Sequence, residues 1–140
     1  MKLTRRQTMA GLAGLGAMPL VGLRPKRALA SGAPVKIGYA ISLTGPNAGG
    51  AGTTILPNYH LWVHELREKG GLKVGDEMHP VEVIEYDDRS NSEEAVRAVE
   101  RLINQDQVDI LLAPWGTAMN LAVGPLFDRH GYIQSTPTAI

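Results

Sequence analysis

Residues 35–52, VKIGYAISLTGPNAGGAG, decide the fold. The stretch begins as a strand, because Val35, Ile37, Tyr39 and Ile41 alternate with smaller or polar residues and nearly all of it is apolar enough to be buried on both faces. A glycine-rich run follows the strand. A buried strand that leads into a glycine-rich loop and then a helix presents backbone N–H groups to a small anionic ligand in open α/β sheets.

The rest of the chain predicts helices and strands in alternation. Residues 54–69 should form a helix, with Pro57 in its first turn and Gly70-Gly71 ending it. Residues 71–79 read as a turn-rich connector, and residues 80–86 as a second strand. The apolar stripe of the helix contains Ile55, Tyr59, Trp62, Val63 and Leu66.

The second half of the chain continues the pattern. Its second helix has two alternative capping boxes, Ser90 with Glu93 or Asn91 with Glu94. In its third helix, Thr117 is the expected N-cap, Gly124-Pro125 should kink or split the helix, and Gly131 should end it. The predicted elements are a helix at residues 91–105, a strand at 108–113, a helix from 117 and a strand at 132–135.

This order of elements predicts an α/β fold with a doubly wound parallel sheet. The length of 140 residues suffices for one domain and not two. The absence of cysteine excludes a disulfide scaffold and a thiolate metal site. Because no closing helix follows the fourth strand, we expect the sequence to be a piece of a longer protein.

The basic residues are unevenly distributed. Residues 1–30 hold six of the 14 basic residues and none of the 14 acidic ones, so residues 31–140 carry a formal charge of −6. An acidic body argues against nucleic acid as a partner.

Residues 1–30 have the composition of a cleavable export signal. A basic start precedes a short apolar run, and Ala28-Leu29-Ala30 fits the small-x-small rule, which places cleavage after Ala30. Arg5 and Arg6 indicate the twin-arginine type, although Thr8 stands where that type prefers a large apolar residue, so a generic secretion signal is the alternative. Both predict a mature protein from Ser31 in the periplasm.

Short motifs occur in a fixed order along residues 35–140, and together they resemble the type I periplasmic binding proteins, in the branch of branched-chain amino acid receptors of ABC importers. That resemblance implies two α/β lobes that close on a ligand, of which this chain covers about two-thirds of the first. The motifs are Ile37-Gly38, Leu43-Thr44-Gly45-Pro46 with Ala48 and Gly52, Gly70-Gly71, Tyr86-Asp87-Asp88, residues 95–103, Ala113-Pro114 with Thr117 and Ala122, and residues 131–138.

The resemblance implies a non-catalytic receptor for an amino acid or related small carboxylate, which would deliver it to the membrane permease of an ABC importer. It implies no cofactor and a monomeric complete protein. A sensory ligand-binding domain of the same fold, for amides or aromatic acids, is the first alternative. An exported α/β enzyme is a further alternative, although no nucleophile–base pair, phosphate loop or dinucleotide fingerprint is present.

Ligands of open α/β sheets bind beyond the carboxyl ends of the strands, and in the family's strand order residues 43–52, 114–117 and 136–140 share that edge. Gly116 and Thr117 combine close backbone approach, a hydroxyl and a helix N-terminus, which suits a carboxylate. Gly116 replaces a serine common in the family, and Thr117 could alternatively serve only as a cap.

Further candidate ligand contacts surround this pair. The resemblance places Thr136, Thr138 and Ala139 where the ligand's ammonium binds, although Ile140 stands where one alignment wants threonine. Trp115 could cover an apolar or aromatic ligand group or simply pack. The backbone near Asn47 and Gly50 could also contact the ligand, or form only a turn.

Three polar groups are interpreted as structural rather than functional. Asp87-Asp88 could do acid–base work or bind a metal, but Asp88 suits a turn cap better. His60 and His64, with Glu65 beside them, have metal-pair spacing but lack a third ligand. Glu93-Glu94 is a solvated helix start. No metal site is predicted.

Overall fold

The structure is a computed structural model that describes residues 32–138. Its sheet has β1 (Val35–Ile41) at the centre, β4 (Val81–Asp87) on one side and β5 (Ile110–Leu112) on the other. Both pairings are parallel. The order β4-β1-β5 therefore confirms the doubly wound α/β prediction. The predicted signal peptide, Ala139 and Ile140 lie outside the described residues.

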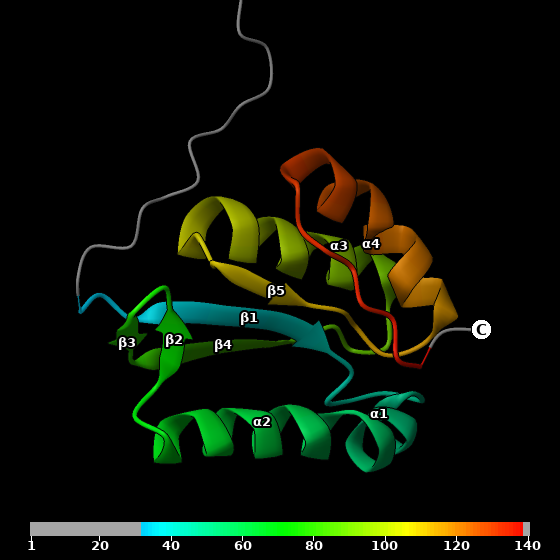
Figure 1. Ribbon diagram of the computed structural model, residues 1–140. Helices are drawn as coiled ribbons and strands as arrows, with labels where there is room; N and C mark the ends of the chain where they lie inside the picture. The colour runs from blue at the N-terminus through cyan, green and yellow to red at the C-terminus, as the bar shows by residue number, and fades with distance from the viewer. Residues whose placement is uncertain (1–31, 139–140) are drawn as a thin grey trace, which may run out of the picture.

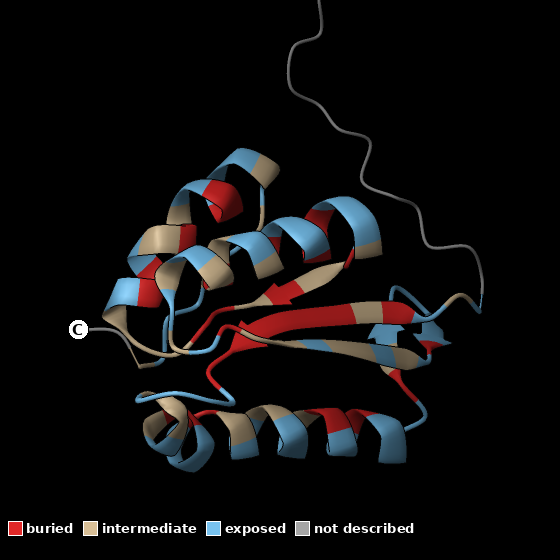
Figure 2. Ribbon diagram, turned by 180° about the vertical axis from the view of Figure 1, so that it is seen from behind, coloured by how far each residue is buried: buried red, intermediate tan, exposed pale blue. Residues whose placement is uncertain are grey.

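Helices cover both faces of this sheet (Figure 1). The helices α1 (Ala48–Thr54) and α2 (Leu56–Glu68) lie on one face, and α3 (Ser92–Arg101) and α4 (Thr117–His130) lie on the other. Figure 2 shows buried residues concentrated in β1 and on the inward sides of the helices. Because β1 is covered on both faces, Ile37, Tyr39 and Ile41 are almost wholly buried.

The glycine-rich run is helical, so the prediction of a loop up to residue 52 was wrong. The helix α1 begins six residues before the expected start, and Ile55 joins it to α2. Ala51 is buried against β1, and the hydroxyls of Thr53 and Thr54 bond to carbonyls one turn earlier. Packing of one small residue and these local bonds thus outweigh the low helix propensity of glycine.

The predictions for α2 are confirmed. Pro57 lies in its first turn, and Gly70 and Gly71, which both have positive φ, follow its end. Val63 and Leu66 are buried against the sheet.

The predicted connector at residues 71–79 is instead a hairpin of β2 (Leu72–Val74) and β3 (Glu77–His79). Each strand has only three residues, which is too short for an alternating pattern to be visible in the sequence. The buried His79 ring, whose Nδ1 lies 2.9 Å from the Ala33 carbonyl oxygen, attaches the hairpin to the start of the described chain.

Asn91 caps α3, because its side chain accepts hydrogen bonds from the amides of Glu93 and Glu94. The second capping alternative is therefore the observed one. The helix continues as the π-helical turn η1 (Leu102–Asp106) to residue 106, close to the predicted end at 105.

The helix α4 runs unbroken through Gly124-Pro125, so the predicted split is wrong. Proline removes one hydrogen bond to the carbonyl four residues earlier, at Leu121, which is 74% exposed. Water can bond to that carbonyl instead, so the helix tolerates the missing hydrogen bond. Gly131 ends the helix with φ 72°, as predicted.

Residues 132–135 form no strand, contrary to the prediction. Their side chains, rather than their backbone, attach them to the lobe. The Tyr132 hydroxyl donates to the Val108 carbonyl at 2.6 Å, and the Gln134 amide donates to the Asn120 carbonyl and side-chain oxygens. Ile133 is 89% exposed, so this apolar side chain is not buried as it would be in a strand of the sheet.

Candidate functional site

The turns that follow β1 and β5 and the end of the described chain lie at the carboxyl end of the sheet (Figure 1). We call residues 43–47, 114–117 and 136–138 at this end the rim. Side chains of α1 and the loop after β4 reach the same region, as the contacts below show.

Trp115 forms one wall of the rim. Its indole Nε1 donates to the Thr54 hydroxyl at 2.9 Å, and that hydroxyl donates to the Gly50 carbonyl at 2.7 Å. A Cβ atom on Gly50 would lie only 2.4 Å from Cζ2 of the indole, so the ring packs directly on the backbone of α1. Trp115 and Gly50, which the sequence predicted as site residues, are therefore in contact, with the ring half-buried.

Gly116 and Thr138 also meet at the rim. The Gly116 amide lies 3.4 Å from the Thr138 hydroxyl oxygen and donates to it. Gly116, with φ 86° and ψ 153°, is the N-cap of α4, and Thr117 is the first helical residue. The prediction of Thr117 as N-cap is therefore wrong by one residue, because glycine adopts this backbone conformation without the strain of a Cβ atom.

Asn120 holds this part of the rim together, and sequence reasoning missed it. Its buried side chain donates to the carbonyls of Pro114 and Gly116 at 2.9 and 2.8 Å. Its side-chain oxygen accepts from Gln134 at 3.1 Å. The only signal in the sequence was an asparagine one turn inside a helix, where its side chain competes with backbone hydrogen bonds.

A second missed side chain supports the turn after β5. The Tyr59 hydroxyl donates to the Ala113 carbonyl at 2.9 Å, and burial raises the pKa of Tyr59 to about 12. The hydroxyl therefore remains a donor throughout the physiological pH range.

Asp87 organises the loop after β1. Its carboxylate accepts from the Thr44 hydroxyl at 2.6 Å and from the amides of Leu43, Thr44 and Arg89. Burial alone would raise the pKa of Asp87, but the Thr44 hydroxyl and these amides together lower it below its ordinary value of 3.8. The ionised carboxylate thus fixes the loop.

We expect Asp87→Asn to lower the free energy of unfolding by about 1 kcal/mol at pH 7, since charged hydrogen bonds are lost from a partly solvated site. A lowered folded-state pKa stabilises the fold above the unfolded value and ceases to do so as the pH falls through the folded value. The difference between wild type and variant should therefore shrink below about pH 4, as measured by urea unfolding from pH 2.5 to 7.

Asp88→Asn provides a control, because its effect on stability should depend on pH in the opposite direction. Burial, the largest cause, raises the pKa of Asp88, so the wild-type carboxyl should become relatively less stabilising as the pH rises. A pH-independent effect of Asp87→Asn would contradict the assigned role.

Asp88 itself is structural, in line with its interpretation as a turn cap. Its Oδ1 accepts from the Ser42 hydroxyl at 2.6 Å and from the Ser90 amide at 2.8 Å. Its Oδ2 is buried and has no hydrogen-bond partner within residues 32–138. These hydrogen bonds hold the carboxyl between the ends of β1 and β4, away from solvent.

The other predicted site residues lie nearby or remain undescribed. The backbone N–H of Asn47, at the start of α1, donates to the Ser90 hydroxyl at 3.0 Å. Thr136 is exposed and Thr138 half-buried, while Ala139 lies outside the described residues.

The histidine pair lies beside a carboxylate of the sheet. His60 and His64 project from α2, and the Glu85 carboxylate of β4 lies 3.6 Å from His60 Nε2. Among residues 32–138, no group of three or more His, Cys, Asp or Glu side chains is arranged to hold a metal ion. Helices of the same range are all too short or too polar to cross a membrane.

These features define a doubly wound α/β lobe whose polar turns gather at the carboxyl ends of its strands. The sequence profile of the family described as "Periplasmic binding protein" matches residues 34–139, and the chain belongs to that family.

Solved structures share the same fold. The substrate-binding protein LivJ of a branched-chain amino acid transporter from Streptococcus pneumoniae, in complex with isoleucine, has a TM-score of 0.65 and 24% identity over 76% of this chain and 29% of its own. A putative branched-chain amino acid ABC transporter protein from Rhodospirillum rubrum has a TM-score of 0.64 and 25% identity over 76% and 29%.

A third structure is an ABC-transporter solute-binding protein from Rhodopseudomonas palustris, in complex with 3,4-dihydroxybenzoic acid. It has a TM-score of 0.61 and 25% identity over 76% of this chain and 27% of its own. The chain thus spans less than a third of the length of each of these proteins.

Proposed function

We propose that this chain is part of the first lobe of an extracytoplasmic solute receptor that serves an ABC importer. The observation that carries the proposal is the N-terminus of α4, which begins at Thr117 and lies at the rim beside Gly116 and Thr138. Amide donors at a helix N-terminus bind a carboxylate without a charged side chain. A second lobe would close over this surface.

The ligand is a small carboxylate with an apolar or aromatic body. The Trp115 ring, fixed by Thr54 and packed on Gly50, offers a flat apolar wall beside the polar turn. Isoleucine and dihydroxybenzoic acid, the ligands of two similar structures, both combine a carboxylate with an apolar body. An amino acid would in addition place its ammonium near the oxygens of Thr136 and Thr138.

We expect Thr117→Val to weaken ligand binding by the complete protein by roughly ten- to a hundredfold, because a hydrogen bond to a charged group is lost. Isothermal titration with isoleucine and with 3,4-dihydroxybenzoate measures the change. Thr53→Val is the matched control, since the Thr53 hydroxyl bonds to the Gly49 carbonyl on the exposed side of α1. Unchanged affinity in Thr117→Val would remove this residue from the site.

The proposal includes export to the periplasm and transfer of the ligand to a membrane permease. Residues 1–30 would be removed after Ala30, with Arg5 and Arg6 as the twin-arginine pair. We expect protein recovered from the periplasm to begin at Ser31, as read by N-terminal sequencing and intact mass. A mature product that retains Met1–Arg6 would contradict the signal-peptide assignment.

A further inference from the structure

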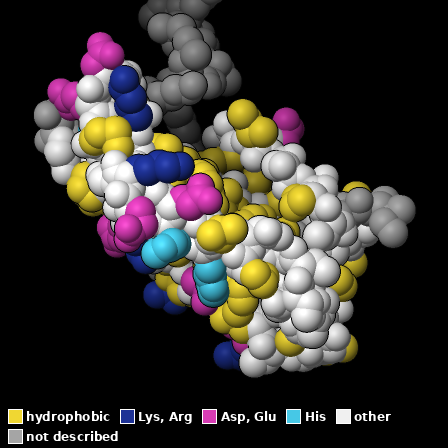
Figure 3. Space-filling model, turned by 60° about the horizontal axis from the view of Figure 1, so that its bottom comes forward, with side chains coloured by type: hydrophobic (Ala, Val, Ile, Leu, Met, Phe, Trp, Pro, Cys, Tyr) yellow, Lys and Arg dark blue, Asp and Glu magenta, His cyan; other side chains and the backbone are white. Residues whose placement is uncertain are grey.

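A pocket lies on the α2 side of the sheet, between that helix and β4. Its volume is about 370 Å³, within the range of small-molecule sites. Figure 3 shows this side of the molecule, where histidine side chains lie among acidic, basic and hydrophobic ones. We call it the outer pocket. Its lining residues are Tyr39, His60, Val63, His64, Arg67, Val83 and Glu85.

The floor of the outer pocket is apolar and firmly packed. Tyr39 and Val63 are 1% and 5% exposed, and Val83 is half-buried. The Tyr39 ring packs on that of Tyr59 at a centroid distance of 5.3 Å. Burial and then the neighbouring Glu85 carboxylate raise the pKa of Tyr39, so its hydroxyl stays neutral.

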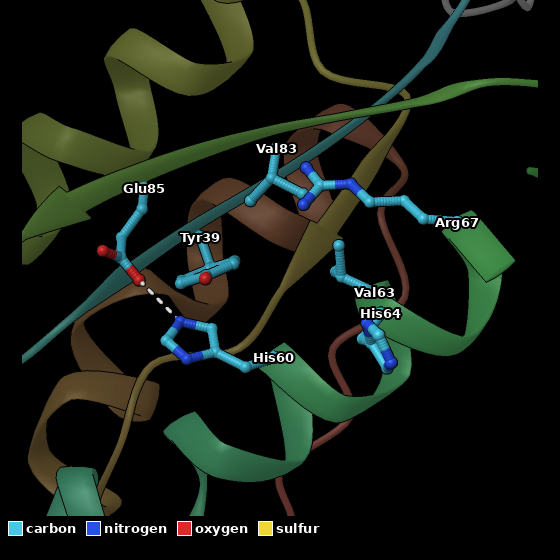
Figure 4. A pocket seen from close by; sticks show the side chains of 7 residues that line it. All are labelled: Tyr39, His60, Val63, His64, Arg67, Val83 and Glu85. Atoms are coloured by element: carbon cyan, nitrogen blue, oxygen red, sulfur yellow. Dashed lines mark ion pairs between the residues drawn. The ribbon is translucent and has the colours of Figure 1, made fainter.

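Opposite charges face the pocket from its two sides (Figure 4). The Glu85 carboxylate projects from β4 towards His60, and the Arg67 guanidinium extends from α2 towards Val83. Residues 60 and 67 lie two turns apart on α2, roughly 10 Å along its axis. Within residues 32–138 no ion pair joins Arg67 to a carboxylate, so the two charges share a space without neutralising each other.

We propose that the outer pocket is a second ligand site, for a small dipolar molecule with an ammonium at one end, a carboxylate at the other and a short apolar body between them. The carboxylate would pair with Arg67, whose fork of N–H donors suits it. The ammonium would pair with Glu85, and the body would cover Tyr39 and the two valines. A simple anion would gain only the contact with Arg67, and a simple cation only the contact with Glu85.

The test uses three probes of equal length: 6-aminohexanoate, hexanoate and hexylamine. Each is titrated into the complete protein with its valine methyl groups labelled for NMR. Val63 and Val83 report on the pocket, while Val99 and Val123, buried on the opposite face of the sheet, report on the integrity of the fold. We expect 6-aminohexanoate to shift the two pocket valines and to bind about tenfold more tightly than either single-charge probe.

Two variants separate the roles of the charges. Arg67→Gln should abolish the advantage of 6-aminohexanoate over hexylamine, and Glu85→Gln its advantage over hexanoate. Lys69→Gln is the matched control, because Lys69 is an exposed cation on the same helix turn that pairs with Glu65 outside the pocket. The proposal would be overturned if the three probes bound equally or if the Val63 and Val83 resonances did not shift. It would also be overturned if either variant kept the full preference for 6-aminohexanoate. None of these outcomes depends on ligand binding at the rim.

Discussion

Gly71→Ala is expected to lower the free energy of unfolding by at least about 3 kcal/mol. A Cβ atom at this position would lie 1.9 Å from the His79 carbonyl oxygen and 2.5 Å from its carbon, so backbone rather than a movable side chain must shift. The φ of 123° adds strain for any residue with a side chain. Because Gly71 directly precedes Leu72, which pairs with His79, we expect β2 and β3 to separate at this end of the hairpin.

Gly70→Ala is the matched control for this prediction. Gly70 is adjacent and also has positive φ, 85°, but a Cβ atom at this position would meet no other atom within 4 Å. Its replacement should therefore cost only the left-handed strain, about 1 kcal/mol. Urea unfolding of both variants measures the difference, and equal losses would show that the close approach at Gly71 contributes nothing.

Asn120→Ala is expected to lower the free energy of unfolding by about 2–4 kcal/mol, because a buried hydrogen-bond network is broken. The carbonyls of Pro114 and Gly116 would lose their donor, and Gln134 would lose an acceptor. The turn before α4 should loosen as a result. We therefore expect the Trp115 fluorescence and the Gly116 amide resonance to change, together with weaker ligand binding by the complete protein.

Asn58→Ala separates this network from an ordinary helical asparagine. The Asn58 side chain donates to the carbonyl four residues earlier, at Thr54, as the Asn120 side chain does to Gly116, but Asn58 is exposed. Its loss should cost less than about 0.5 kcal/mol. If both variants lose the same stability, burial of the Asn120 network is not what stabilises the rim.

The elements that sequence predicted correctly have strong local signals. Examples are the apolar run of β1, the Gly70-Gly71 end of α2 and the Gly131 end of α4, which each depend on neighbours within a few residues. Right-handed crossovers then favour a doubly wound parallel sheet. The order of its strands came from the resemblance to the family.

The elements that sequence missed depend on contacts between distant segments. The helix α1 contains three glycines and is stabilised by packing of Ala51 under β1, which no local propensity reveals. The strands β2 and β3 are too short to show a period. Residues 132–135 have a strand-like pattern but bond through side chains to Val108 and Asn120.

The sequence predicted where the candidate site lies, but not the side chains that hold its turns in place. The edge of the sheet follows from the fold, so Trp115 with Gly50 and Gly116 with Thr138 come together as expected. The partners of Asp87, Tyr59 and Asn120 could not be predicted, because a carboxylate, phenol or amide can bond to many turns and only the folded chain selects one.

The central position of β1 governs when this lobe can form during synthesis. Val35 pairs with Val81, and Ile37 pairs with Ile110, so neither neighbour exists when β1 leaves the ribosome. The loops between the strands must be closed before these pairings stabilise the chain, which slows folding. The most buried strand is therefore synthesised first and remains unpaired longest. A nascent chain shorter than about 110 residues presents it as a binding segment for chaperones.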